Sequence, residues 1–209
     1  MNPITKVVDR YPELEPLQTV IFEAGEVLSS TYAAKKKLMV CGNGGSASDS
    51  EHIVGELMKG YFLKREVPQG FRDALVKNHP AEGDYLAKHL QGALPAISLV
   101  SQSALISAYA NDVAADMVYA QQVYGYGEAG DALLALSTSG NSTNVLNAVK
   151  VAAAMGIHTI GLTGAKGDRL AALCDVCIKV PKESTPEVQE LHLPIYHAIC
   201  EMLEERFFG

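Results

Sequence analysis

A glycine-rich turn between a predicted strand and a predicted helix is the feature that most constrains the fold. Residues 38–41 form a short apolar run, and Gly42-Asn-Gly-Gly-Ser46 follows it with residues that tolerate positive φ angles. Ser48 and Glu51 have the spacing of a capping box, which predicts a helix that runs to about Met58. A strand, a glycine turn and a helix N-terminus together offer free backbone N–H groups, which commonly bind phosphate.

Apolar runs and helical patterns alternate along the rest of the chain. Because strands that alternate with helices form a parallel, doubly wound sheet, the fold class is α/β. Ligands of such sheets bind beyond the carboxyl ends of the strands. The further strands are predicted over 96–100, 132–136, 158–162 and 176–180, and the last helix over 186–204.

Two segments lie outside this alternation. Residues 14–36 repeat apolar side chains at helical spacing and end in a lysine cluster, which predicts one long helix before the first strand. We expect this helix to need a partner surface, and a second subunit is one candidate. Residues 62–95 contain Pro, Gly and mixed charges, with short helices expected near 71–77 and 84–91. We interpret this irregular segment as a lid or an oligomer contact.

Composition limits the classes of function. The 209 residues carry a net charge of −7, with 48% hydrophobic and 20% charged residues, as expected for a globular α/β protein. The acidic balance argues against general binding to nucleic acid or to a membrane, and no apolar run is long enough to span one. The N-terminus has no signal-peptide pattern, and Cys174-Asp-Val-Cys177 leads into an apolar run. We therefore expect buried thiols, no disulfides and a cytoplasmic protein.

The first turn has three interpretations. Residues 42–47 fit the dinucleotide fingerprint G-x-G-x-x-G/A, which also needs an acidic residue at the end of a second strand about 20 residues later. Glu66 has that spacing, but its neighbours do not resemble a buried strand. A plain tight turn is the second interpretation, and phosphate or sugar binding is the third and the one we favour. The chain also lacks a nucleotide P-loop motif, so we expect no nucleotide cofactor.

A second polar turn, Ser137-Thr-Ser-Gly-Asn-Ser142, follows the strand predicted over 132–136. Ser139 or Ser142 alone could cap the next helix, but the turn holds more hydroxyl groups than capping needs. A nest of hydroxyl and N–H donors is sufficient to bind a monophosphate.

Two predicted helices carry candidate acid–base groups. His52 and Glu56 are four residues apart and so lie on one helix face, although an ordinary surface pair has the same spacing. Gln189, His192 and His197 lie on the last helix, where a histidine beside an apolar stripe is more often structural. Gln189 and His197 are roughly 12 Å apart along an ideal helix, a spacing that by itself does not nominate one site.

Several of these motifs together resemble one known family. The resemblance covers most of 14–207 and is to the sugar isomerase (SIS) domain proteins of the phosphoheptose isomerase group. It implies a five-stranded parallel sheet between helical layers, a single SIS domain over 1–209, and a homotetramer with sites between subunits. The residues that carry it, in order, are 41–47, His52-x-x-x-Glu56, 110–112, 130–142, 162–164, Val188-Gln-Glu-x-His192 and His197.

The resemblance also implies an activity and a site. The reaction would be aldose–ketose isomerisation of a sugar phosphate through an enediol, with Glu56 and His197 as the acid–base pair and sedoheptulose 7-phosphate or a related sugar as substrate. Some members bind zinc, and nitrogen and carboxylate ligands suit that metal. The implied zinc ligands are His52, Glu56, Gln189 and His197. The implied phosphate ligands are Ser137, Thr138, Ser139 and Ser142, and the remaining substrate contacts are Asn43, Gly44, Gly45, Ser46, Glu56, Asn111, Asp112 and Gln189.

Two departures from the family pattern bear on the substrate. The segment 62–95 is longer than the usual connection, and Gly60 stands where an arginine is common, with Lys59, Lys64 and Arg65 nearby. The alternative function is a non-catalytic SIS module that binds a phosphosugar or a protein. Such modules tend to lose the carboxylate and the final histidine, and this chain keeps both, which favours an enzyme.

Overall fold

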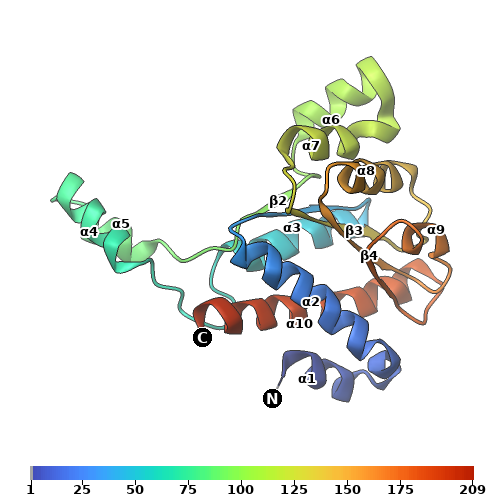
Figure 1. Cartoon of the computed structure of the whole chain (residues 1–209), viewed down its shortest axis with the longest axis horizontal. Coiled ribbons are helices and arrows are strands. Elements are labelled where there is room, and N and C mark those ends of the chain that lie inside the picture. Colours follow the sequence, from blue (N-terminus) through green and yellow to red (C-terminus); the bar gives the residue numbers. More distant parts are fainter. Residues whose placement is uncertain (1) are drawn as a thin grey trace.

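A five-stranded parallel sheet crosses the molecule, as predicted (Figure 1). The computed structural model describes residues 2–209. The strand order is β2-β1-β3-β4-β5, so β1 lies between β2 and β3. The chain adds β2 on one side of β1 and then adds β3, β4 and β5 on the other side. The strands are β1 (Leu38–Cys41), β2 (Ala96–Ser98), β3 (Ala132–Ser137), β4 (His158–Thr163) and β5 (Val176–Lys179).

Helices cover both faces of the sheet, which gives the expected three layers (Figure 1). Alternate residues of β1 point to opposite faces, so Leu38 and Val40 join one buried cluster and Met39 and Cys41 join the other. The first cluster lies under α1 (Pro3–Arg10), α2 (Gln18–Ala33), α3 (Gly45–Met58) and α10 (Thr185–Phe208). The second lies under α7 (Val118–Tyr126), α8 (Thr143–Ala154) and α9 (Asp168–Ala171), next to α6 (Ser103–Tyr109).

The N-terminal region differs from the single long helix predicted over 14–36. Residues Pro12–Leu17 form a 3-10 helix, and α2 begins only at Gln18. Pro16 explains the late start, because proline cannot donate a helical hydrogen bond and disfavours a helical conformation in the residue before it. Helix α2 ends at Ala33, and Lys35 has a positive φ of 59°. Helix α1, which the sequence did not suggest, packs against α10.

The start of α3 also differs from the prediction. The helix begins at Gly45, with Gly44 at the N-cap position and a φ of +58°. Ser48 therefore lies inside the helix, and the capping box with Glu51 is wrong. The carboxylate of Glu51 instead accepts a hydrogen bond from the Ser101 hydroxyl at 2.9 Å.

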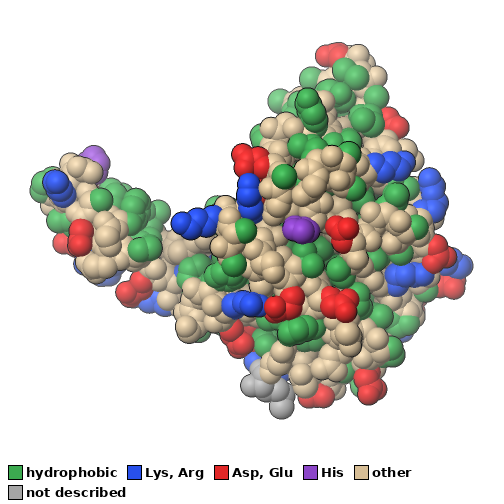
Figure 2. Space-filling model, viewed as in Figure 1, with side chains coloured by type: hydrophobic (Ala, Val, Ile, Leu, Met, Phe, Trp, Pro, Cys, Tyr) green, Lys and Arg blue, Asp and Glu red, His purple; other side chains and the backbone are tan. Residues whose placement is uncertain are grey.

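The segment 62–95 contains the two short helices that were predicted. Helices α4 (Gln69–Asn78) and α5 (Gly83–His89) pack on each other in a protruding unit, residues 66–91, which we name the arm (Figure 1). No residue of α4 is buried, and Phe71 and Tyr85 are exposed on the arm. Figure 2 shows hydrophobic side chains over much of the surface of this unit. The two ends of the arm meet where the Gly92 N–H donates to the Arg65 carbonyl at 2.8 Å.

All four cysteines carry free thiols. Cys41 and Cys200 are buried as expected, whereas Cys174 and Cys177 are only half-buried. Within residues 2–209, no helix combines the length and the apolar character needed to cross a membrane.

Candidate active site

The two polar turns lie next to each other at one edge of the sheet. Strands β1 and β3 are parallel neighbours, and one turn follows each of them. The strand order reverses between these two strands, and such a reversal is the usual ligand-binding crevice of a doubly wound sheet. The fold therefore brings both turns to the position where a ligand is expected.

The first turn is bonded to the helix that follows the second. The Asn43 amide nitrogen donates to the Asn144 side-chain oxygen at 2.9 Å, and the Asn144 amide donates back at 2.9 Å. The Tyr119 hydroxyl lies 2.7 Å from the Gly42 carbonyl and 3.1 Å from the Asn43 side-chain oxygen. Helix α3 has no side-chain cap, but the N–H groups of Ser46 and Ala47 donate to the Asn43 and Gly44 carbonyls at 3.1 and 3.0 Å, so this helix start offers a ligand the Gly45 N–H rather than the whole first turn. Ser46 is only 3% exposed.

The second turn keeps its hydroxyl groups clear of capping bonds. Ser142 is the N-cap residue of α8, yet its side chain makes no capping hydrogen bond and accepts one from Ser137 Oγ at 3.1 Å. Ser139 Oγ accepts from the Asn141 N–H at 3.2 Å. Gly140 has a φ of +64°, and its N–H closes the turn on the Ser137 carbonyl at 2.9 Å. The capping alternative for Ser142 is thus not realised.

Helix α10 brings a third N-terminus to the same place. Gln189 packs so closely on Gly45 that an added Cβ there would lie 2.2 Å from Gln189 Nε2. Thr185 Oγ1 lies 3.4 Å from Thr138 Oγ1, and α10 also lacks a side-chain cap bond. The N-termini of α3, α8 and α10 therefore converge on the turn 137–142, which we name the phosphate turn after the role that the sequence predicts for it. Their combined partial positive charge favours an anion despite the net charge of −7.

An imidazole and carboxylate cluster lies further along α3 and α10. His52 Nε2 is 3.2 Å from Glu56 Oε1 and 3.4 Å from His197 Nε2. Glu56 also pairs with Lys59 Nζ at 3.1 Å. The structure thus brings together three of the predicted residues, His52, Glu56 and His197, which we name the acid–base cluster. His197 lies eight residues, or roughly 12 Å, beyond Gln189 along the same helix.

Neighbouring groups determine the protonation of His197 and the orientation of the His52 ring. Burial and the neighbouring His52 lower the pKa of His197, and Glu56 raises it only in part, so this imidazole is neutral at neutral pH. The Tyr196 hydroxyl lies 3.0 Å from His52 Nδ1 and 3.1 Å from Asp49 Oδ1. This bridge leaves His52 Nε2 facing Glu56 and His197.

A cavity of about 340 Å³ lies between α1 and α10, and His197 is the one residue of the acid–base cluster among those that line it. His197 and Tyr61 line it, together with the cationic side chains of Lys6 and Arg10 from α1. A sugar that reaches His197 therefore has space beside it.

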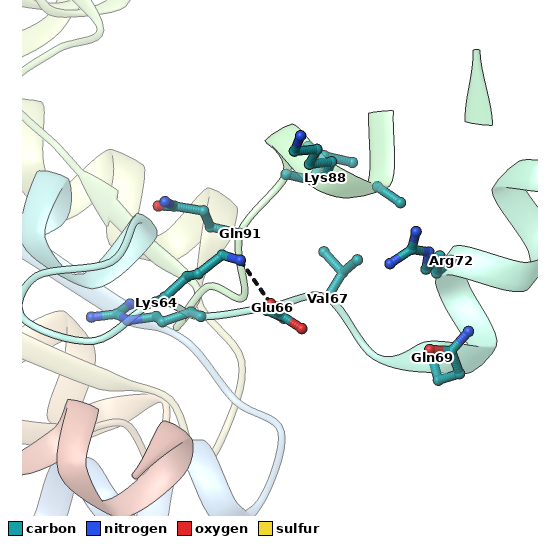
Figure 3. A pocket seen from close by; sticks show the side chains of 10 residues that line it. Lys64, Glu66, Val67, Gln69, Arg72, Lys88 and Gln91 are labelled. Atoms are coloured by element: carbon teal, nitrogen blue, oxygen red, sulfur yellow. Dashed lines mark hydrogen bonds and ion pairs between the residues drawn. The ribbon is translucent and has the colours of Figure 1, made fainter. Parts of the chain in front are cut away.

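A second cavity, of about 310 Å³, lies at the root of the arm and contains none of the predicted site residues (Figure 3). Cationic side chains including Arg72 and Lys88 line it, and Lys64 pairs with Glu66 across it at 2.8 Å. We do not assign it to the reaction.

Asn111 and Asp112 are exposed and bond to each other rather than to the other predicted residues. They lie on an exposed π-helical turn, Ala110–Ala114, and Asn111 Nδ2 donates to Asp112 Oδ1 at 2.8 Å. No side-chain hydrogen bond in the described part of the chain joins either residue to the phosphate turn or to the acid–base cluster.

The predicted zinc site is not formed as a metal-binding group. Among residues 2–209, no three His, Cys, Asp or Glu side chains are arranged to hold a metal ion. The donor types in the acid–base cluster do suit zinc, since they are two imidazoles and a carboxylate.

Several residues that shape the site were missed at the level of sequence. Asn144 and Thr185 each lie within two residues of a helix start, a position that could have marked them as contacts of a bound ligand. Asp49 stands three residues before His52, which places it on the same helix face. Tyr196 adjoins His197, but it also fits the apolar stripe of α10 and gave no separate signal.

Comparison with known proteins identifies the family of this chain. Residues 83–164 match the SIS domain. The phosphoheptose isomerase of Rhodospirillum rubrum is 36% identical over 94% of this chain and 91% of its own length, and that of Akkermansia muciniphila is 32% identical over 100% and 96%. The structure of phosphoheptose isomerase from Neisseria gonorrhoeae is similar with a TM-score of 0.76 and 30% identity, covering 96% of this chain and 94% of that one.

Both the fold and the extent of identity agree with the resemblance seen in the motifs, since the match to these relatives runs over nearly the full chain. The chain belongs to the phosphoheptose isomerase family of SIS-domain proteins.

Proposed function

We propose that the protein is an aldose–ketose isomerase of phosphosugars that acts on sedoheptulose 7-phosphate. The observation that carries this proposal is that α10 joins the two halves of the site, with Gln189 at the phosphate turn and His197 in the acid–base cluster. The relatives named phosphoheptose isomerase support the substrate. The non-catalytic alternative is not favoured, because those relatives are isomerases and both Glu56 and His197 are present.

The phosphate turn supplies binding and position. The hydroxyls of Ser137, Thr138, Ser139 and Ser142, helped by the partial positive charge of three helix N-termini, bind the phosphate dianion. Fixing that end holds the carbonyl end near the acid–base cluster, which removes much of the entropic cost of the reaction. The separation of roughly 12 Å along α10 suits a long seven-carbon substrate better than a short one.

Glu56 and His197 move the protons. Glu56 removes the proton from C1 of the ketose while the carbonyl oxygen on C2 gains a proton from His197, which yields the enediol. The proton then returns to C2, and the C1 hydroxyl gives up its proton as the aldehyde forms. A neutral imidazole can donate to one oxygen and accept from the other, and general acid–base catalysis of this kind contributes about 10²–10⁴-fold.

We also propose a homotetramer with sites between subunits. Asn111 and Asp112 stand exposed and apart from the rest of the site in one chain, and a neighbouring copy would supply the missing contact. Exposed apolar side chains, among them Val113, Tyr124 and Leu193, are available to such an interface.

Zinc and a cytoplasmic location stay predictions. The predicted ligands are His52, Glu56, Gln189 and His197. Of these, His52, Glu56 and His197 lie together and would hold the metal, whereas Gln189 lies at the phosphate turn. A bound zinc ion would polarise the substrate's oxygens. Elemental analysis of protein purified without added metal tests this. Full activity in the absence of zinc would contradict a catalytic role for the metal.

The test of the proposed function is a substrate panel. Purified protein is incubated with ketose phosphates of five, six and seven carbons, and aldose formation is followed. We expect turnover of sedoheptulose 7-phosphate and at least tenfold lower kcat/KM for the shorter sugars. Binding of sedoheptulose 7-phosphate without turnover would instead favour the non-catalytic module.

A further inference from the structure

A buried ion pair lies at the base of the arm, outside the acid–base cluster. The side chains of Arg65 and Glu204 are 0% and 1% exposed, and Arg65 Nε donates to Glu204 Oε1 at 2.7 Å. The Phe208 ring covers the guanidinium at 4.7 Å. Because burying two charges is costly, the further bonds that each of them makes indicate the role of the pair.

The other nitrogens of Arg65 bind the end of the helix that carries Glu56. Arg65 Nη2 donates to the Glu56 carbonyl at 3.0 Å, and Nη1 donates to the Leu57 carbonyl at 2.7 Å. Carbonyls in the last turn of a helix have no partner within the helix. A cation at this end also matches the partial negative charge of the helix C-terminus. The guanidinium thus fixes the backbone of Glu56 itself.

Glu204 binds the chain that follows that helix. Its two oxygens accept the backbone N–H groups of Tyr61, Phe62 and Leu63 at 2.7, 2.6 and 3.0 Å. Burial acts to raise the pKa of Glu204, but these N–H groups and Arg65 outweigh it and hold the pKa below its usual range. The carboxylate is therefore ionised at neutral pH.

The same bonds reach His197. The Tyr61 ring lies with its centroid 5.7 Å from the His197 ring, and the Tyr61 N–H is one of the groups held by Glu204. Glu204 stands two helical turns after His197 on α10. The Arg65–Glu204 ion pair therefore connects three parts of the structure. They are the backbone of Glu56, the Tyr61 segment beside the His197 ring, and helix α10, which carries His197.

We propose that Arg65, with Glu204, is a positioning residue that sets where the Glu56 carboxylate lies relative to His197. Among residues 2–209, neither side chain makes a hydrogen bond to a side chain of the acid–base cluster or to the phosphate turn. A misplacement of about 1 Å between reacting groups can cost about 10²-fold in rate, so a link of this kind acts on turnover. The inference rests on the proposed isomerase activity.

The first test is Arg65→Lys. Lysine keeps the charge but has no planar fork, so it cannot bind Glu204 and both carbonyls together. We expect kcat for sedoheptulose 7-phosphate to fall at least tenfold, with KM changed less than threefold, because the phosphate turn lies at the other end of α3 and α10. Arg72→Lys is the matched control, since Arg72 is exposed on the arm and pairs with Asp84 at 2.9 Å; its kcat should stay as in the wild type.

The second variant separates positioning from folding. Arg65→Met with Glu204→Gln removes both charges and keeps an acceptor for the backbone N–H groups. Replacing a buried ion pair by hydrophobic residues of similar volume is often close to neutral for stability, whereas removing one partner alone leaves an uncompensated buried charge. The double variant avoids that charge. We expect a folded protein with an unfolding temperature near that of the wild type and a kcat still at least tenfold lower.

The outcomes are distinct. Wild-type kcat in Arg65→Lys or in the folded double variant overturns the inference. If both variants fail to fold, the pair serves folding alone and the inference is also overturned. An inactive wild type instead refutes the proposed function.

Discussion

His192 illustrates how one residue in a functional helix can serve the fold rather than the reaction. It lies on α10 between Gln189 and His197 and is 0% exposed. The sequence pattern of a histidine beside an apolar stripe favoured a structural role, and its burial agrees with that interpretation. By contrast, the acid–base roles of Glu56 and His197 were predicted only through the resemblance to SIS-domain isomerases. That resemblance depends on several motifs that occur in the family's order.

Burial of His192 makes stability depend on pH. Burial lowers its pKa from 6.5 to about 4, because the charged imidazolium is disfavoured. The free energy of unfolding is therefore highest above pH 6.5 and falls as the pH drops from 6.5 towards 4. Over that range the unfolded chain protonates His192, whereas the folded protein keeps it neutral. Between pH 7.5 and 5 the loss is about 2 kcal/mol.

Urea unfolding of the wild type and of His192→Leu at those two pH values measures this term. We expect the variant to lose about 2 kcal/mol less than the wild type over the same interval. An identical pH dependence in the two proteins would show that the His192 imidazole is not responsible.

At the scale of elements, the sequence predicted which segments form strands and helices. It predicted the first residue of a helix less well. Apolar runs located all five strands, although β2 ends two residues early at Ser98. The start of α3 was misplaced because Gly44 takes a positive φ and opens the helix before Ser48 can cap it. Bonds between turns, such as Asn43 with Asn144, join residues about a hundred positions apart and leave no local signal.

The shape of the phosphate turn depends on Gly140. Its φ of +64° disfavours any side chain, and an added Cβ would lie 2.4 Å from the Gly167 backbone. We expect Gly140→Ala to distort the turn and to raise KM for sedoheptulose 7-phosphate at least tenfold, which corresponds to about 1.4 kcal/mol of lost binding. Steady-state kinetics checks this result.

Gly70→Ala is the matched control for Gly140→Ala. Gly70 lies in helix α4 with no atom within 4 Å of an added Cβ, so alanine should leave KM unchanged and stabilise slightly. An unchanged KM in Gly140→Ala would mean that this turn does not hold the phosphate.

At the scale of the whole molecule, the parallel sheet and its layers followed from the alternation of patterns, but the direction of the arm did not. Residues 66–91 bury little against the body, so no apolar periodicity fixed their place. The assignment of 1–209 to a single SIS domain with 62–95 as an insertion is therefore tested by removing the arm.

We expect the body to fold without the arm. Arg65 and Gly92 are already joined by a 2.8 Å hydrogen bond, so residues 66–90 can be replaced by a short Gly-Ser turn that keeps Gln91 bonded to the Gly60 N–H. We expect the free energy of unfolding to fall by less than about 1 kcal/mol, which would lower the unfolding temperature by at most about 2–4 °C. Circular dichroism measures this change, and light scattering shows whether the shortened chain still forms the proposed tetramer. A chain that no longer folds would contradict the insertion.

The most direct test of the central claim is proton exchange in deuterated water, with sedoheptulose 7-phosphate as substrate and NMR as readout. We expect the wild type to introduce deuterium at C1 of the ketose, and Glu56→Gln to lose this exchange by at least 10²-fold while it still binds the sugar phosphate. Full exchange by Glu56→Gln, or none by the wild type, would contradict an enediol mechanism in which the phosphate turn delivers the sugar to Glu56 and His197.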